Sequence, residues 1–339
     1  MRKNCPRFLP SFIFFLLLIC ANISVTAQLK KYVFEAEKMG SPLRIIMMCD
    51  DSTKAALLAK QAYALTDSIN AIISDYDTSS ELSRLNSSSG SAAPIVVSPL
   101  LLRLIWHAGM AHHHSRGAFD ASIGPLSKLW RKARKENIFP TTEIEEKKKL
   151  VNFGLVYIDR FKSTVWLRKT GMSIDFGGIG KGFMANQLLD FFYSKGIRQV
   201  MVDAGVDIAV GEAPEGTKGW QIGVVLPETT DQLFQKKLTL EYKAIATSGS
   251  IYQYFEHEGK KYSHIIDPRT GYGIQTPRNV TVIAGSGEDA DWLATACSIL
   301  PIKDALKLVK FMNAAILITE LSHGQVITHA SKNFYNYWK

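Results

Sequence analysis

The sequence predicts an α+β fold, in which helices and antiparallel strands occupy different stretches of the chain. Apolar residues recur at helical spacing mainly before residue 150, and short strand-like runs separated by turns dominate after it. This segregation favours α+β over a regular βαβ alternation. The chain has 339 residues, is 46% hydrophobic and shows no internal repeat, so it is long enough to bury a sizeable core.

The first 27 residues have the three parts of a secretory signal peptide. A basic start precedes an unbroken apolar run over 12–21, and small or β-branched residues lead to Ala27. We expect cleavage after Ala27, which leaves residues 28–339 exported, in the periplasm or cell envelope. A lipid anchor on Cys20 and an uncleaved membrane anchor stay open, although Ile19 makes a poor lipobox. The basic residues are Arg2, Lys3 and Arg7.

The helix-rich part of the mature chain, residues 28–150, begins with two strands. These strands lie within 31–49 and meet near Met39-Gly40-Ser41-Pro42. Ser52 is a suitable N-cap for the first helix, and residues 75–93 form a polar loop rich in Ser. The predicted helices of this part are 53–73, 99–115, 125–135 and a short one that begins at Thr141.

The strand-rich part, residues 151–339, contains short apolar runs paired across turns. Its predicted strands are 157–159, 164–167, 173–176, 199–203, 207–210, 220–225, 238–242, 244–247, 279–284, 315–319 and 325–328. Its predicted helices are 182–194, 290–300 and 303–312. Together the two parts form one predicted domain over residues 28–339.

Charge and cysteine content exclude several classes of protein. Removal of the signal's three basic residues lowers the formal net charge from +9 to +6, spread along the chain. No segment interleaves basic and aromatic residues, so a nucleic-acid partner is not expected. Only Cys49 and Cys297 remain after cleavage, without a C-x-x-C pair, and two buried free thiols are favoured over one disulfide. Adjacent helix residues diverge by about 100°, so His112-His113-His114 is structural or solvated rather than a metal site.

The densest chemical signal is the segment Asp175-Phe176-Gly177-Gly178-Ile179-Gly180-Lys181-Gly182. Glycines let a backbone approach a ligand closely, and the N-terminus of the helix that follows suits a phosphate. Lys181 adds a positive charge. The segment is neither a Walker motif nor a dinucleotide fingerprint, because the spacing differs from both. The alternative is a glycine-rich turn with a surface lysine, which four glycines within six residues make less attractive.

Asp291 and Thr295 are four residues apart, so they share one face of a helix near its start. A carboxylate and a hydroxyl in this arrangement can bind a hard cation such as Mg²⁺. The alternative is that Asp289 caps the helix and Asp291 interacts with its dipole.

A turn at Asp267-Pro268-Arg269-Thr270-Gly271 follows His264, which lies beside an apolar pair. A histidine fixed next to such a turn can carry a proton or bind a ligand, although a single histidine is more often structural. The neighbouring segment Thr247-Ser248-Gly249-Ser250 is predicted to be a hydroxyl-rich turn that contacts the ligand.

Taken in order, these motifs resemble the ApbE family of FAD:protein FMN transferases, formerly described as thiamine-biosynthesis lipoproteins. The resemblance runs through almost the whole mature chain. The matching segments are Met39-Gly40-Ser41, Ser74-Asp75-Tyr76, Ser79-Ser80-Glu81-Leu82, Leu85-Asn86, Gly117-Ala118-Phe119-Asp120, Gly124-Pro125-Leu126, Leu129-Trp130, 175–182, Ala246-Thr247-Ser248-Gly249, 264–271, Ala290-Asp291 and Thr295-Ala296.

The resemblance implies a two-lobed fold with mixed or antiparallel sheets flanked by helices and an FAD cleft between the lobes. It implies Mg²⁺ (with Mn²⁺ left open) bound by the Gly178 carbonyl, Asp291 and Thr295. His264, Asp291 and Lys181 would serve the chemistry, and His264 would be an acid/base group or a phosphate contact. Tyr76 would stack on the flavin. The other expected FAD contacts are Met39, Ala118, Phe119, Asp120, Asp175, Lys181 and Ile265.

The implied reaction moves FMN from FAD to a Thr or Ser hydroxyl of an exported or membrane-bound redox protein and releases AMP. Sequence leaves the group that deprotonates this hydroxyl open among Asp291, His264 and a metal-bound path. An FAD pyrophosphatase, a non-catalytic FAD-binding protein of the envelope and, more remotely, a solute binder are the alternatives. Val206, Asn186 and an extra residue before Tyr252 depart from the family pattern and put the loop geometry around the flavin in doubt.

Overall fold

The computed structural model describes residues 28–224, 237–249, 254–322 and 325–338. The predicted signal peptide, residues 1–27, lies outside these ranges, as do Ser250 and Tyr252. Helices and antiparallel sheets make up the described chain, so the α+β prediction is confirmed. None of the described helices has the length and apolar character needed to cross a membrane.

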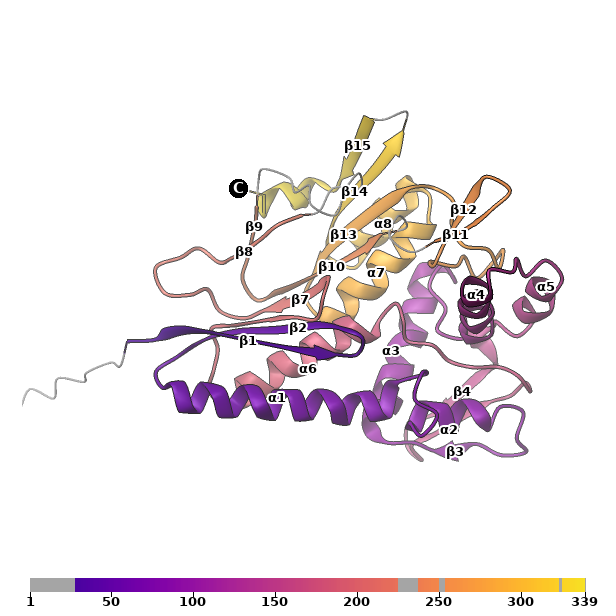
Figure 1. The fold of residues 1–339 in the computed structure, drawn as a ribbon, viewed down its shortest axis with the longest axis horizontal. Coiled ribbons are helices and arrows are strands. Elements are labelled where there is room, and N and C mark those ends of the chain that lie inside the picture. Colours follow the sequence, from indigo (N-terminus) through magenta and orange to yellow (C-terminus); the bar gives the residue numbers. More distant parts are fainter. Residues whose placement is uncertain (1–27, 225–236, 250–253, 323–324, 339) are drawn as a thin grey trace, which may run out of the picture.

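An eight-stranded antiparallel sheet forms the centre of the molecule (Figure 1). Its order, β1-β2-β6-β7-β10-β13-β14-β15, joins the first two strands of the chain to strands that come much later. The strands are β1 (Lys30–Lys38), β2 (Ser41–Cys49), β6 (Val200–Asp203), β7 (Asp207–Val210), β10 (Lys243–Gly249), β13 (Arg278–Ala284), β14 (Ala315–Ser322) and β15 (Gln325–Ala330). The predicted hairpin turn is confirmed, with both Met39 and Gly40 at positive φ.

The two faces of the sheet support different layers, because side chains alternate along each strand. Ala244 and Ala246 of β10 pack toward the helices, whereas Ile245 packs on the opposite side. The helical side carries α1 (Ser52–Ile73), α3 (Pro99–Ser115), α6 (Gly180–Ser194), α7 (Gly287–Ile299) and α8 (Ile302–Phe311). The other side is covered by β8 (Trp220–Ile222), β9 (Leu238–Leu240) and the 3-10 helix Lys332–Asn336.

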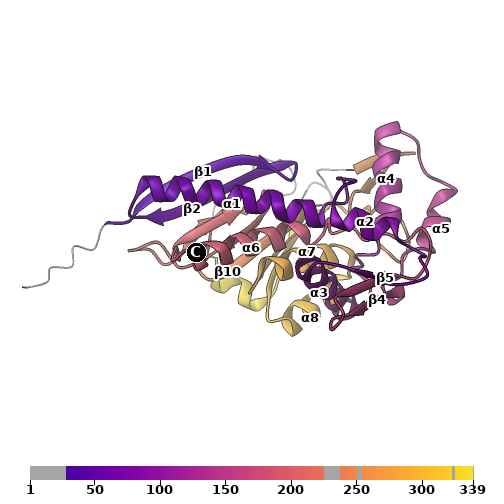
Figure 2. The same cartoon turned by 90° about the horizontal axis from the view of Figure 1, so that it is seen from below.

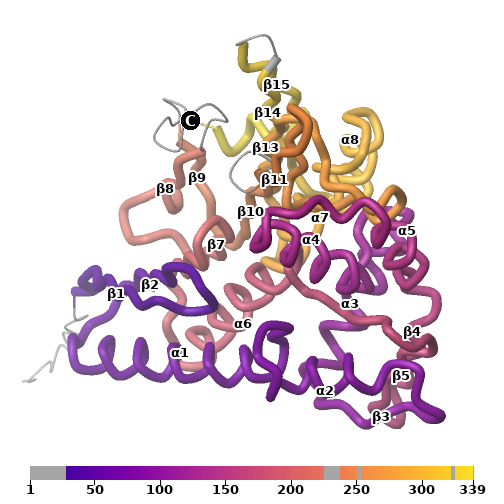
Figure 3. The backbone as a smooth tube through the Cα atoms, turned by 45° about the vertical axis from the view of Figure 1, so that its right-hand side comes forward, coloured from indigo at the N-terminus to yellow at the C-terminus, as the bar shows by residue number. Residues whose placement is uncertain are grey.

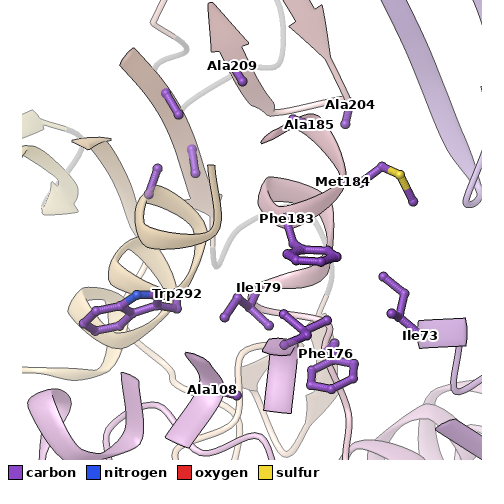
Figure 4. Close-up of a cluster of buried hydrophobic side chains, with 14 of the residues drawn as sticks. Ile73, Ala108, Phe176, Ile179, Phe183, Met184, Ala185, Ala204, Ala209 and Trp292 are labelled. Atoms are coloured by element: carbon purple, nitrogen blue, oxygen red, sulfur yellow. The ribbon is translucent and has the colours of Figure 1, made fainter. Parts of the chain in front are cut away.

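The main core lies between the sheet and these helices. Figure 4 draws part of it, with Phe183 of α6, Trp292 of α7 and Ile179 in one cluster of buried side chains. Figure 2 shows α1 lying along the β1–β2 hairpin, which it contacts. Cys49 and Cys297 are both buried and free, as the sequence favoured.

A smaller core lies at the side of the molecule where α4 (Gly124–Glu136) meets the hairpin β11 (Tyr254–His257) and β12 (Lys260–Ser263). Figures 1 and 3 both show α4 beside β11. Trp130 is completely buried there and stacks on Tyr262 with ring centroids 5.6 Å apart. The remaining elements are α2 (Glu81–Ser87), α5 (Glu143–Lys148), the 3-10 helix Phe153–Leu155, and the sheet β3 (Ile95–Val96), β5 (Thr164–Leu167) and β4 (Val156–Asp159).

Three local predictions are wrong. The N-cap of α1 is Asp51, whose carboxylate accepts the Lys54 N–H at 2.6 Å, rather than Ser52. The predicted loop 75–93 contains the capped helix α2. Residues 173–176 form only an isolated bridge, because the Asn86 side chain bonds both the N–H and the carbonyl of Ile174, at 2.7 and 2.9 Å, where a neighbouring strand would pair.

Helices α6 and α7 approach each other through glycines at their N-terminal ends. A Cβ placed on Gly182 would lie 2.1 Å from the carbonyl oxygen of Gly287, and one on Gly287 would lie 2.0 Å from that of Gly182. The far end of α7 is held by Arg278, which donates to the Leu300 carbonyl at 3.0 Å and pairs with Glu320 at 2.5 Å. Both ends of α7 are therefore fixed by specific contacts.

We expect Gly182→Ala to destabilise the protein by about 2 kcal/mol, because the new methyl group has to push the two helix ends apart. Gly285→Ala is the matched control, since nothing lies within 4 Å of the position its Cβ would take. Urea unfolding monitored by tryptophan fluorescence measures both variants. Equal stability of the two variants would contradict the tight α6–α7 contact.

Candidate active site

All twelve residues predicted to bind FAD or metal or to serve the chemistry line one cavity of about 1380 Å³. Pockets for small ligands are commonly about 300–1,000 Å³, so this one has room for a large ligand and a second reactant. The twelve are Met39, Tyr76, Ala118, Phe119, Asp120, Asp175, Gly178, Lys181, His264, Ile265, Asp291 and Thr295. The structure thus brings together residues from the β1–β2 turn, four helical regions and the turn after β12.

The glycine segment enters the cavity as the start of α6. Gly177 N–H donates to Asp175 at 2.6 Å, and the Gly180 N–H bonds back to the Phe176 carbonyl at 2.7 Å, so the loop is tightly folded. Gly177, Gly178, Gly180 and Lys181 all line the cavity. The helix N-terminus and the Lys181 ammonium make this end attractive to an anion.

The predicted cation donors meet where α7 crosses the glycine loop. A Cβ on Gly178 would lie 2.8 Å from the Thr295 Oγ1, so the loop backbone packs directly against this hydroxyl. Asp291 is 5% exposed and accepts the Gly182 N–H at 3.0 Å. A carbonyl, a carboxylate and a hydroxyl are oxygen ligands of the type that Mg²⁺ prefers.

The electrostatics of Asp291 also fit a cation. Burial raises its pKa to about 7, against the opposing effects of the Gly182 N–H and of Lys181. Buried carboxylates are normally paired or bound to metal. The described residues contain no cluster of three or more His, Cys, Asp or Glu side chains able to hold a metal. The predicted set has one such side chain, and Mg²⁺ usually takes its other ligands from water and substrate phosphates.

Arg131 of α4 also lines the cavity and joins two carboxylates. Its guanidinium pairs with Asp75 and, at 3.3 Å, with Asp175, and it stacks over the Tyr76 ring at 4.4 Å. Burial and the nearby Asp75 raise the pKa of Asp175, whereas Arg131 opposes this shift. Tyr76 itself is 78% exposed, so its outer face is open to a ligand ring.

The segment Ala118-Phe119-Asp120 is buried and follows α3. Asp120 accepts the Ser122 N–H at 2.7 Å and lies 3.2 Å from the Nδ1 of His112, which stacks on Phe153. The hydrogen bond with Asp120 raises the pKa of His112. The first histidine of the triplet is therefore structural, as predicted, and it supports a residue of the cavity wall.

His264 and Ile265 lie between β12 and the predicted Asp-Pro turn. The turn is confirmed by the Gly271 N–H, which donates to the Asp267 carbonyl at 2.8 Å, with Gly271 at positive φ. Ile265 is buried, and His264 is exposed on the cavity wall.

The segment 247–249 is the end of strand β10 rather than a turn, although Thr247, Ser248 and Gly249 do line the cavity. Ser248 Oγ lies 3.3 Å from Thr295 Oγ1, which links the strand to the predicted cation donors. Ser250 lies outside the described residues.

Sequence analysis missed Arg131 and Asp207 as residues of the cavity wall. The only available signal for Arg131 was its position beside the apolar stripe of α4. Asp207 opens a short strand, a place where an acidic residue has no distinctive pattern.

Comparison with known proteins gives a consistent result. The model of the ApbE family matches residues 39–318, which include all twelve predicted residues. The chain belongs to the ApbE family. The FAD:protein FMN transferase of Haemophilus influenzae is 28% identical over 317 residues, which cover 91% of each chain.

Two solved ApbE structures share the fold. The flavin transferase ApbE of Vibrio cholerae superposes with a TM-score of 0.81 at 26% identity and covers 91% of this chain and 99% of its own. The ApbE protein of Thermotoga maritima gives a TM-score of 0.81 at 27% identity, with the same coverage. The cavity of the present chain therefore lies within an ApbE fold that matches almost from end to end.

Removal of Arg131 leaves two buried carboxylates without their shared cation. We expect Arg131→Ala to lower the free energy of unfolding by roughly 3 kcal/mol. The loss should be larger in alkaline than in acidic buffer, because burial and Asp75 raise the pKa of Asp175, which takes up a proton in acid and then no longer needs the cation. Lys132→Ala, at an exposed neighbour, should change stability by less than about 0.5 kcal/mol. Urea titrations at both pH values test this, and equal effects of the two substitutions would refute it.

Proposed function

We propose that this chain is an FAD:protein FMN transferase. It transfers the FMN half of FAD to the hydroxyl of a Thr or Ser in an acceptor protein and releases AMP. The observation that carries this proposal is that one cavity of an ApbE-family chain contains every residue predicted for binding and chemistry. The name that the Haemophilus influenzae relative bears supports the same activity.

FAD would occupy the cavity between the Arg131 group and the start of α6. The exposed face of the Tyr76 ring would offer a stacking surface for the flavin. The Arg131 guanidinium packs over the Tyr76 ring and holds it in place. Met39, Ala118 and Phe119 would supply the apolar wall. Asp120 and Asp175 would contribute hydrogen-bond acceptors to the bound cofactor.

The residues Gly178, Asp291 and Thr295 would hold Mg²⁺ or Mn²⁺. A bound divalent cation supplies positive charge that stabilises the developing charge on phosphate oxygens.

Side chains that line the cavity near these cation ligands would act on the pyrophosphate of FAD. Lys181 would bind phosphate oxygens, and the positive end of the α6 helix dipole would favour them in the same place. His264 would hydrogen-bond a phosphate oxygen from the opposite wall. Phosphoryl transfer depends mainly on this kind of positioning and charge neutralisation.

We further propose that the protein is exported and acts on an exported or membrane-bound redox protein. The basic and apolar segments of residues 1–27 support export. The absence of interleaved basic and aromatic residues in the sequence gives no support to a nucleic-acid partner.

The deciding experiment incubates the purified protein with FAD, a Thr-containing acceptor domain of an exported flavoprotein, and Mg²⁺ with or without EDTA. We expect the mass of the acceptor domain to rise by one FMN, with release of AMP, only in the samples that contain Mg²⁺ without EDTA. AMP and free FMN without a mass gain would indicate a pyrophosphatase. Bound FAD without AMP would indicate a binding protein.

Asp291→Asn should abolish Mg²⁺-dependent transfer while keeping the fold, because the Asn oxygen can still accept the Gly182 N–H. Glu288→Gln, on the same helix but outside the cavity, is the matched control and should keep activity. Transfer rates over a Mg²⁺ titration measure the effect. Wild-type activity in Asp291→Asn would remove Asp291 from the cation site.

Tyr76→Ala should weaken FAD binding by about 1 kcal/mol, the usual contribution of a ring stack, and leave the rate at saturating FAD unchanged. Tyr157→Ala removes another exposed ring that lies under an arginine, 5.4 Å from Arg168, but does not line the cavity. Quenching of flavin fluorescence gives the Kd for both variants. Similar Kd values for the two would contradict the stacking role.

A further inference from the structure

Arg134 of α4 is a half-buried cation that lines the cavity without a partner. Its Nη1 atom is shielded from solvent and has no hydrogen-bond partner within the described chain. Among the cavity-wall residues that the structure describes, no other has a buried side-chain polar atom in this condition. A donor that is left unpaired and cut off from water costs free energy, so this position calls for a ligand that supplies an acceptor.

The other arginine and lysine side chains of the cavity wall have counter-charges. Arg131 pairs with two carboxylates, and the charge of Lys181 acts on two more. No carboxylate of the described residues forms an ion pair with Arg134. Burial lowers the pKa of the Arg134 guanidinium, Arg131 adds to this effect and Tyr76 opposes it. The described part of the cavity wall therefore contains one guanidinium that no anion balances.

The position of α4 places Arg134 beside the ring that is expected to stack on the flavin. Arg131 and Arg134 are three residues apart, so they lie on one face of the helix. Arg131 packs over the Tyr76 ring at 4.4 Å, and Tyr76 also acts on Arg134. Trp130 fixes the helix, because it is completely buried and donates to the Gly271 carbonyl at 2.8 Å. Arg134 is therefore held near Tyr76 by a well-packed element.

The last turn of a helix also favours a basic residue through the helix dipole. Arg134 and Lys135 both occupy the last turn of α4. Lys135 is exposed and does not line the cavity. The dipole accounts for a positive charge in this turn, but it supplies no acceptor to a shielded nitrogen. Lys135 is therefore the matched control that separates a dipole role from a ligand-binding role.

We propose that Arg134 binds the pyrimidine edge of the flavin ring of FAD, where the carbonyl oxygens and N1 accept hydrogen bonds. This inference rests on the proposed transferase function and on the stacking of the flavin on Tyr76. A guanidinium carries its N–H donors in a planar fork, which suits a row of acceptors on a flat ring. The phosphates of FAD are expected at Lys181, which leaves Arg134 for the ring.

The test measures ligand binding by the full chain carrying Arg134→Gln or Lys135→Gln, with Mg²⁺ present and no acceptor protein. Quenching of flavin fluorescence gives the Kd for FAD and for riboflavin, and titration calorimetry gives the Kd for ADP. We expect Arg134→Gln to bind FAD and riboflavin roughly 10- to 100-fold more weakly, the range for a hydrogen bond to a charged group. Its affinity for ADP should match wild type. Lys135→Gln should match wild type for all three ligands.

The reduction potential of bound FAD provides a second measurement. A reduced flavin gains negative charge at N1, so a neighbouring cation favours the reduced form. Arg134→Gln should therefore make the potential more negative, while Arg134→Lys, which keeps the charge, should stay closer to wild type. Because Arg134 has no partner in the ligand-free protein, Arg134→Gln should not lower the melting temperature.

Four results would overturn the role of Arg134. They are unchanged FAD affinity in Arg134→Gln, an unchanged potential of its bound FAD, an equal loss of ADP binding, which would assign Arg134 to the phosphates, and an equal loss in Lys135→Gln, which would assign the effect to the helix dipole. The wild-type protein keeps this test separate from the proposed function. If it binds FAD but transfers no FMN to an acceptor, the transferase proposal fails. If it transfers FMN and Arg134→Gln binds FAD normally, only the role of Arg134 fails.

Discussion

The site depends on how closely α6 and α7 approach at their N-terminal ends. Gly182 and Gly287 leave no room for a Cβ between the two backbones. This approach lets the Gly182 N–H reach the Asp291 carboxylate and sets the glycine loop against Thr295. One backbone contact therefore aligns the N-terminal end of α6 with a set of oxygen donors on α7. The surrounding sheet and core hold these two helices in place.

Two groups of residues in the cavity wall each set one basic side chain beside two aspartates. Arg131 pairs with Asp75 and Asp175 and packs over the Tyr76 ring, so this group joins an ion-pair network to an exposed aromatic face. Asp207 and Asp291 both interact with the Lys181 charge, and burial raises the pKa of both carboxyls. A cation bound beside Asp291 would offset negative charge that Lys181 alone does not balance.

Local patterns were enough to predict most elements and to single out the glycine segment, His264, Asp291 and Thr295. The family resemblance named the other predicted residues that gather in the cavity. Helix α3 has the predicted bounds, and the glycine segment opens a helix as expected. Predictions failed where distant residues intervene, as at Ile174, whose backbone bonds to the Asn86 side chain instead of a strand. For the same reason the positions of Arg131 and Asp207 in the cavity wall could not be predicted, because they arise only when α4 and β7 reach the cavity.

The anchoring of α7 at both ends has a thermodynamic consequence. Gly182 holds its first turn, while Arg278 binds its last carbonyls and is itself held by Glu320. The backbone that carries Asp291 and Thr295 therefore loses its conformational freedom when the protein folds, and little remains to be lost when ligands arrive. Ligand binding at these two side chains should then carry only a small entropic penalty.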